Sequence, residues 1–378
     1  MTKLHARALK THDINEVFVD ELKQREGGLR ARHAWLVPAL DQLSSGRAIT
    51  PPRAPAGVSL AEHADLIDIA SHVGIYRMWA RRGRVTFDLN EHMAAELYRS
   101  AYTTLPGNIF DRLPYINPLC VLPDPWPGRY RNTDALVRGF FIHGYNQLPE
   151  RQTYTDEPDI EGLGLLFVVD LLDQDTGEVR SQTHVRLNIP TGLHQFTLKQ
   201  AVDFAAARAE AVWSREPTEK PVYQLFEELL KPALSILVYL CCDNRDVVEP
   251  PVAAPTRKSR RNRVRQERHP FFVEVGLRIG PRLHAARRAA GRVRDGDHTP
   301  SGVERAPHQR AGHSHRYWTG PKRKREVTLF VAPHWVNFHL LDGIDPITMV
   351  VPVEPQRRDP LRRRGLRGRA GSSAPTTS

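Results

Sequence analysis

Cysteine and long hydrophobic runs are scarce in this sequence of 378 residues. Three cysteines, Cys120, Cys241 and Cys242, are too few for a disulfide framework, and the adjacent pair cannot easily bridge within itself. A reducing compartment fits this usage best. The longest apolar runs, residues 162–172 and 232–242, fall well short of the roughly 20 residues of a membrane span, and residues 1–17 lack the apolar core of a secretion signal. We therefore expect a cytoplasmic protein without a membrane partner.

Acidic residues are sparse in the C-terminal third. Residues 255–378 hold 27 Lys and Arg against 10 Asp and Glu, whereas residues 1–254 hold 27 against 33. The C-terminal part therefore carries a net charge of +17 and the remainder −6. Such asymmetry favours a polyanionic partner for the basic part, most simply nucleic acid, because neutralised phosphates release counterions. A merely solvated basic surface is the alternative, since Arg outnumbers Lys about fivefold, as in high-GC coding.

Hydrophobic periodicity predicts a mixed fold. Helical patterns lie at residues 11–45, 60–78, 92–103, 196–213 and 223–240, and strand patterns at residues 85–89, 138–143, 163–172 and 179–189. Asn90 is a plausible N-cap, and Pro232 should kink the last helix or start a second one. Cys241 and Cys242 end that apolar helix and are expected to be core residues. We predict the α+β class: a helical N-terminal part, a small, mostly antiparallel sheet with packed helices, and a basic C-terminal α/β subdomain.

Composition divides the chain into five parts. Proline and basic residues mark residues 249–268 as a linker, and the few apolar residues after position 353 predict a disordered tail. Between them we expect an extended segment at residues 271–279 and a short helix at residues 281–290. The expected parts are residues 1–58 (helical segment and linker), 59–248 (central α+β domain), 249–268 (basic linker), 269–352 (C-terminal domain) and 353–378 (tail).

The stretch from residue 306 to residue 337 is the densest in chemistry. Seven proton carriers, cations and stacking rings fall within the eleven positions 308–318: His308, Arg310, His313, His315, Arg316, Tyr317 and Trp318. If residues 307–319 form one strand, successive side chains alternate between faces. One face would then carry His313, His315 and Tyr317, and the other would carry His308, Arg310, Arg316 and Trp318.

Three functional interpretations of this stretch stay open. As a metal-independent ribonuclease, His313 with His315 or Tyr317 would act as base and acid, Arg310 or Arg316 would stabilise the phosphorane charge, and His308 would join the centre. As a binding surface, Tyr317 and Trp318 would stack bases while Arg316 and a basic run would pair phosphates. That run comprises Lys322, Arg323, Lys324 and Arg325.

Zinc is the third interpretation, because H-x4-H-x-H supplies three imidazoles and His298 or His334 could complete four. No thiolate or carboxylate has regular ligand spacing, and strand alternation sets His308 opposite the other two. We therefore expect no metal and no cofactor. A purely structural role is the bland alternative, with Trp318 in the core and residues 320–326 as a charged hairpin turn.

The same residues resemble the C-terminal signature of the type V-A anti-CRISPR family, whose members lower the messenger RNA of the CRISPR effector. The matching positions are His308, Arg310, Gly312, His313, His315, Trp318, Gly320, Pro333, Val336 and Asn337. Residues 105–122, 234–243 and 275–286 resemble further family segments in the same order. Ser314 stands where the family commonly has Trp, and His334 replaces an apolar residue.

The resemblance implies a protein encoded by a phage or plasmid that inhibits host defence. Its partners would be RNA, most simply messenger RNA, or a ribosome-associated nascent chain, and the CRISPR effector itself is a possible partner. The alternatives are a ribonuclease-like enzyme that uses the His/Arg motif and a non-enzymatic protein-interaction factor that binds through the acidic N-terminal part.

Overall fold

The computed structural model describes most of the chain between residues 11 and 336. The described ranges are residues 11–44, 52–53, 55–81, 83–100, 105–115, 117–130, 133–144, 162–190, 197–213, 222–248, 271–285, 308–332 and 334–336. The expected linker at 249–268, the tail after 353 and residues 286–290 of the expected short helix lie outside these ranges, as do residues 1–10, 45–51 and 54 of the first expected part.

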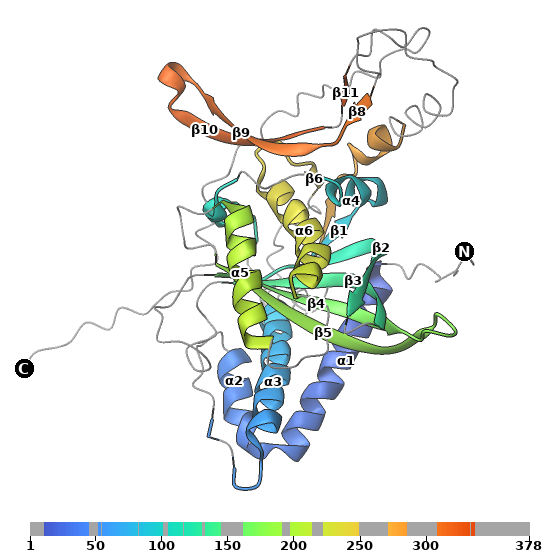
Figure 1. The fold of residues 1–378 in the computed structure, drawn as a ribbon, viewed down its shortest axis with the longest axis vertical. Helices are drawn as coiled ribbons and strands as arrows, with labels where there is room; N and C mark the ends of the chain where they lie inside the picture. The colour runs from blue at the N-terminus through green and yellow to red at the C-terminus, as the bar shows by residue number, and fades with distance from the viewer. Residues whose placement is uncertain are drawn as a thin grey trace, which may run out of the picture.

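A seven-stranded sheet forms the centre of the molecule (Figure 1). Its strand order is β5-β4-β3-β2-β1-β7-β6, in which β1 runs parallel to β2 and β7 and all other neighbours are antiparallel. The strands are β1 (Val85–Leu89), β2 (Leu119–Tyr130), β3 (Thr133–Gly144), β4 (Gly162–Leu172), β5 (Val179–Pro190), β6 (Val247–Val248) and β7 (Phe271–Val275).

Helices cover one face of the sheet with the main hydrophobic core. They are α4 (Glu91–Leu97), the 3-10 helix η2 (Gly107–Arg112), α5 (Leu198–Trp213) and α6 (Val222–Cys241). Nearly every residue of the second half of α6 is buried, as its uniformly apolar sequence predicts. α6 continues through Pro232 as one helix, so no second helix starts there. Asn90 caps α4 by accepting hydrogen bonds from the backbone N–H groups of His92 and Met93.

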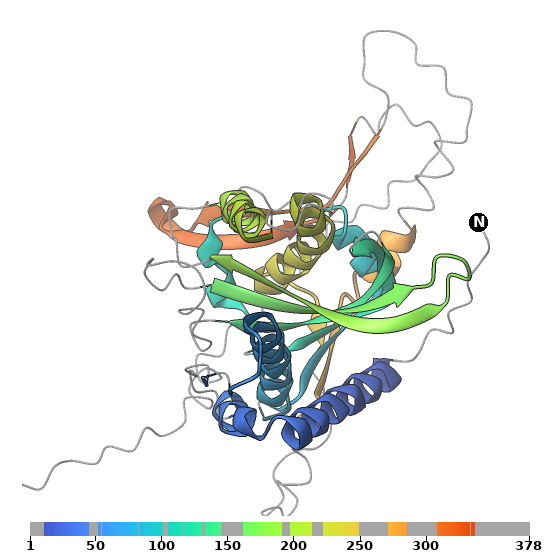
Figure 2. The same cartoon turned by 60° about the horizontal axis from the view of Figure 1, so that its bottom comes forward.

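The opposite face is covered by α3 (Leu60–Arg81), whose second half packs Tyr76 and Trp79 against the central strands. Its first half forms a separate small core with α1 (Thr11–Arg32), η1 (Ala34–Leu36) and α2 (Val37–Ser44). Figure 2 shows the resulting arrangement, with the sheet lying between the N-terminal helices and the pair α5 and α6. Within the described residues, no helix is long and apolar enough to cross a membrane.

Two small antiparallel pairs lie outside the main sheet. β9 (His313–Thr319) and β10 (Arg325–Val331) form a hairpin closed by η4 (Pro321–Arg323), and β8 (His308–Arg310) pairs with β11 (His334–Val336). The β9–β10 hairpin crosses the C-terminal end of α6 (Figure 1).

The α+β class is confirmed, together with most predicted elements. The sheet is larger than expected, because residues 271–275 enter it as β7 and residues 119–130, which contain three prolines, form the 12-residue strand β2. β1 pairs in parallel on both sides, so the sheet is mixed although mostly antiparallel. The helix expected over residues 92–103 ends at Leu97.

Candidate functional site: a docked basic hairpin

The β9–β10 hairpin has two faces of different character. Strand alternation and register place one set of side chains toward the end of α6, and we call this side the inner face. Three of its members are almost fully buried: Ser314, Thr328 and Phe330. The inner face also carries Arg316, Trp318 and Glu326 farther toward the tip. The other side, the outer face, carries His313, His315 and Tyr317 opposite Val331, Leu329 and Val327.

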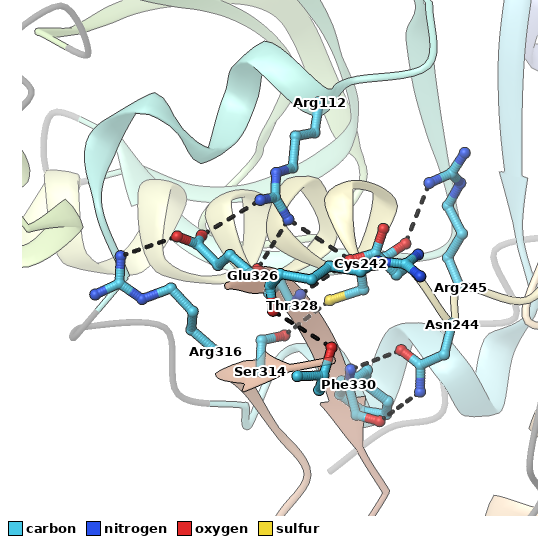
Figure 3. Close-up of polar contacts among 12 residues, drawn as sticks. Arg112, Cys242, Asn244, Arg245, Ser314, Arg316, Glu326, Thr328 and Phe330 are labelled. Carbon is cyan, nitrogen blue, oxygen red and sulfur yellow. Dashed lines mark hydrogen bonds and ion pairs between the residues drawn. The ribbon is translucent and has the colours of Figure 1, made fainter. Parts of the chain in front are cut away.

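The inner face is held by residues 242–244, which follow α6 directly and which we call the docking segment. Asn244 pairs with the backbone of Phe330: its side-chain oxygen accepts from Phe330 N at 2.8 Å, and its side-chain nitrogen donates to Phe330 O at 2.9 Å (Figure 3). Asp243 repeats this pattern with Thr328, donating its N–H to Thr328 O at 2.8 Å and accepting from Thr328 N at 3.0 Å. The docking segment therefore satisfies the edge of β10 as a third strand would.

Arg112, at the end of η2, adds a charged contact to the same strand. Its guanidinium donates to Thr328 Oγ1 at 3.1 Å and to Glu326 at 3.3 Å, and lies 3.6 Å from Asp243. Glu326 also faces Arg316, at 3.7 Å, so this carboxylate lies between two guanidinium groups (Figure 3). Salt bridges of this partly exposed kind are worth about 1 kcal/mol or less, so the backbone pairing carries most of the docking energy.

Cys242 contacts β9 from the docking segment. Its thiol donates to Val238 O at 3.3 Å and lies 3.5 Å from Ser314 Oγ. Burial raises the pKa of Cys242 to about 12, which keeps the thiol protonated at neutral pH. Cys241 is also buried, as expected for core residues. Ser314, where the family commonly has Trp, thus fills a buried position on the inner face.

The start of β9 is anchored by Glu96 of α4. This buried carboxylate accepts a hydrogen bond from Gly312 N at 2.8 Å. A Cβ at position 312 would lie 2.7 Å from Phe330 and 3.2 Å from Glu96, so the close approach requires glycine.

The outer face displays three rings in a row, His313, His315 and Tyr317. Ring centroids are 6.5 Å apart between the two histidines and 4.7 Å apart between His315 and Tyr317, with interplanar angles of 75° and 68°. His313 is half-buried, while His315 and Tyr317 are exposed. Arg325 pairs with Thr319 in the register and so joins the same face beyond Tyr317.

Four exposed cations, Lys322, Arg323, Lys324 and Arg325, form the tip of the hairpin, and we call them the basic tip. Lys322 and Arg323 both adopt positive φ, 57° and 51°, after Gly320 at 78°. Each non-glycine residue in this left-handed backbone conformation costs roughly 1 kcal/mol or more of conformational free energy. Trp318, 53% exposed, precedes the tip on the inner face.

The expected single strand over residues 307–319 is wrong. β8 and β9 belong to different sheets and are separated by Ala311 and by Gly312, which Glu96 holds. Alternation therefore does not relate Arg310 and His308 to the faces of β9. Arg310 is exposed, and His308 lies opposite Val336 in the β8–β11 pair. The predicted common face of His313, His315 and Tyr317 is present, with Arg316 and Trp318 on the reverse.

This arrangement offers acid and base groups on one accessible face and cations at one end of it. Among the side chains that the structure describes, no group of three or more His, Cys, Asp or Glu is placed to hold a metal ion. His298 and the side chains of His308 and His334, which the zinc interpretation needs, lie outside that description.

Sequence reasoning missed the residues that hold the hairpin: Glu96, Arg112, Asp243, Asn244 and Glu326. A signal for two of them exists, because Asp243 and Asn244 follow a buried apolar helix immediately, where polar side chains commonly satisfy neighbouring backbone. Glu96 and Arg112 lie more than 200 positions from their hairpin partners. A local sequence pattern does not predict contacts between residues so far apart in the chain.

The fold and the site define a class: an α+β protein that docks a basic, ring-bearing β-hairpin on the end of a buried helix. The family model described as AcrVA2-like, the anti-CRISPR type V subtype A2 family, matches residues 87–338. Because this match covers more than half of the chain, the protein belongs to the anti-CRISPR type V subtype A2 family, and the resemblance in the sequence is confirmed. Membership suggests a CRISPR-related partner.

A solved structure, titled as the crystal structure of AcrVA2, is similar to this chain at 17% sequence identity and a TM-score of 0.46. The similarity covers 85% of this chain and 96% of that one. Comparison with curated proteins finds no match.

Proposed function

We propose that this protein is an anti-CRISPR factor that lowers the output of a type V-A CRISPR effector by acting on its messenger RNA or its translation. In this proposal the C-terminal hairpin contacts RNA. The observation that carries the proposal is the basic tip, four exposed cations at the end of a firmly docked hairpin, directly after the exposed rings of Tyr317 and Trp318. Cations with adjacent aromatic rings are the groups that bind phosphates and unpaired bases.

Binding is favoured over catalysis by the division of the hairpin faces. A ribonuclease needs its acid, its base and a charge-stabilising cation around one phosphate. Arg316, the cation nearest to the rings in sequence, lies on the face opposite His313 and His315 and is paired with Glu326. Arg325 shares the face of the rings but lies opposite Thr319, six residues along the strand from His313. The rings of His315 and Tyr317 are open to water, which weakens the electrostatic stabilisation of a transition state. A binding surface needs neither a cation beside the acid and base nor the exclusion of water.

The salt dependence of RNA affinity tests the proposal. Fluorescence anisotropy with a labelled unstructured RNA would be measured from low to moderate salt for the wild type and for a variant with all four residues of the basic tip changed to Gln. Each phosphate contact contributes about 0.7 to the slope of log K against log salt for a single strand, so the variant should lose up to about 3 from the slope.

A matched control removes four exposed cations elsewhere, by changing Arg32, Arg99, Arg180 and Lys231 to Gln. This control keeps the same net charge as the tip variant and should retain most of the slope. Equal slopes in the two variants would contradict the proposal, because the charge would then act only as a diffuse field. Absence of RNA affinity in the wild type would reject it outright.

In cells, the consequence is measured on the effector itself. Co-expression with a type V-A effector should lower the effector's messenger RNA and protein, and the tip variant should lose most of this effect. If message still falls with the tip variant at wild-type expression, the protein acts through a protein contact, such as a nascent chain on the ribosome, and not through the tip.

A ribonuclease is the second candidate, favoured by one observation: His313, His315 and Tyr317 share one accessible face in ring contact. It predicts that His313→Ala abolishes cleavage of bound RNA while affinity survives. Undiminished cleavage by this variant removes the enzyme hypothesis.

A further inference from the structure

The ring row of the outer face differs from the basic tip in what it can recognise. The tip carries charge alone and binds any polyphosphate strand, whereas rings select for bases that are free to stack. We infer that the row of His313, His315 and Tyr317 binds unpaired RNA with its bases spread apart, and that Arg325 holds a phosphate of the same strand. This inference rests on the proposed RNA contact and adds the class of RNA.

Spacing along the strand carries the first step. Residues two apart on a β-strand are about 6.7 Å apart, and the centroids of the row are separated by 6.5 and 4.7 Å. Bases in a stacked strand repeat every ~3.4 Å. Three rings at the wider spacing cannot each meet successive bases of a stacked strand. They match bases that have been splayed out, which is the state in which proteins read single-stranded RNA.

The orientation of the rings carries the second step. Interplanar angles of 75° and 68° mean that the rings meet edge to face and do not stack on one another. Beside the rings, on β10, Val327 and Leu329 lie opposite Tyr317 and His315 and are half-buried, so they line one side of the row with apolar surface. Apolar surface beside the rings favours base edges and faces over water.

Charge at one end of the row carries the third step. Arg325 of β10 is exposed and lies on the outer face, opposite Thr319 of β9. It is therefore the next outer-face position after the pair of Tyr317 and Val327. A strand whose bases lie on the rings therefore meets a guanidinium where it leaves the row. Arg316 and Glu326 lie on the inner face, where they face each other at 3.7 Å.

A duplex does not fit this surface. A-form RNA keeps its bases stacked inside the helix, and its deep, narrow major groove is closed to side chains. The basic tip can still contact duplex phosphates, so a duplex should bind through charge alone. Removing the rings should consequently lower the affinity for unpaired RNA and leave the affinity for duplex RNA nearly unchanged.

The test compares one labelled 12-nucleotide RNA, designed without internal pairing, with the same RNA annealed to its complement. The full-length protein should bind the unpaired form at least tenfold more tightly. In the double variant with His315→Ala and Tyr317→Ala, affinity for the unpaired form should fall about tenfold or more, while affinity for the duplex changes less than about twofold.

Tyr98→Ala is the matched control, because the exposed fraction of Tyr98, 40%, equals that of Tyr317, 39%, within a percentage point. Tyr98 is the residue that directly follows α4, and it lies outside the hairpin. This control should bind both RNAs like the wild type. Equal affinities of the wild type for the two RNAs, or an equal loss for both in the double variant, would overturn the inference. In that event, lower RNA affinity of the variant with the basic tip changed to Gln would still support RNA contact by the hairpin. The proposed RNA contact and the proposed preference for unpaired RNA can therefore fail separately.

Discussion

Gly312 is a position where one side-chain atom decides how the hairpin is seated. Its backbone N–H reaches the buried Glu96, and an added Cβ would lie 2.7 Å from the ring of Phe330. Because Phe330 is itself packed edge to face on Tyr239 at 5.1 Å, it has little freedom to withdraw.

Gly312→Ala should therefore lower the free energy of unfolding by about 1–3 kcal/mol, the usual cost of overpacking a filled site. Urea denaturation followed by tryptophan fluorescence measures the change. Gly27→Ala serves as the control, since a Cβ at this helical position has no neighbour within 4 Å. The control should be neutral or slightly stabilising. A Gly312→Ala protein as stable as this control contradicts the close packing described.

Buried histidines between α3 and the sheet predict how stability depends on pH. Burial, with help from nearby charges, lowers the pKa of both His143 and His184 from 6.5 to about 3. Both imidazoles stay neutral in the folded protein, while the unfolded chain takes up protons near pH 6.5. Stability is therefore fully present above pH 6.5 and is lost as the pH falls from 6.5 toward 3.

Between neutral pH and about pH 5 the loss should be roughly 2 kcal/mol for each of the two histidines. Urea midpoints at the two pH values measure it. His184→Gln should remove about half of the dependence, because one proton fewer is taken up on unfolding. A variant with the full wild-type slope would show that His184 is not held neutral.

At the scale of elements, the docking segment controls the hairpin as a unit. Asn244→Ala removes both hydrogen bonds to the backbone of Phe330 and leaves that buried N–H and C=O without their partner. The expected cost is about 1–3 kcal/mol. Hydrogen exchange of the β9 and β10 amides should accelerate at least tenfold, while amides of β4, in the centre of the sheet, serve as the internal control. Faster exchange in both strands and β4 alike would indicate global destabilisation instead.

Charge on the hairpin stem should tune RNA affinity. Glu326 faces Arg316 at 3.7 Å and Arg112 at 3.3 Å, so it offsets positive charge next to the proposed RNA surface. Glu326→Gln should raise RNA affinity about threefold at low salt, with the gain shrinking as salt screens it. Glu178→Gln, the same charge change at an exposed residue in the turn between β4 and β5, is the control. An equal gain in both variants contradicts a local role for Glu326.

The elements themselves were largely predictable from the sequence. Continuous apolar runs mark β4 and α6, since both are buried on most sides, and the cap at Asn90 marks the start of α4. The alternation of His313, His315 and Tyr317 followed from strand geometry alone. The break before β9 could not be predicted, because it depends on Glu96, which lies 216 positions away from Gly312.

At the scale of the whole molecule, the parallel pairing of β1 with β7 explains how distant segments meet. β7 follows α6 and β6 in the chain and pairs between β1 and β6, one strand from the edge of the sheet, which brings residues 276–285 next to α4. Gly276 lies against Met93, and Gly280 lies against Asn90. The pattern of five residues in β7 predicts a strand but does not indicate which strand it pairs with. The order of the seven strands therefore could not be predicted from the sequence alone.

The same architecture gives the hairpin its place. β10 is paired to the docking segment, β9 is anchored to α4, and Arg112 of η2 reaches Thr328 and Glu326 of β10. Three separate elements of the family-matched region therefore hold one hairpin, whose tip and outer face stay exposed. A scaffold that fixes the stem and frees the tip is suited to presenting a binding surface.

Ultraviolet crosslinking in cells tests the central claim most directly. The full-length protein would be crosslinked to RNA, digested, and the peptides that carry a nucleotide identified by mass spectrometry. The account predicts that crosslinked residues concentrate in 313–325, with Tyr317 and Trp318 foremost and Tyr98 unmodified. Crosslinks that avoid the hairpin and fall instead on α1, α5 or the sheet edge would contradict it.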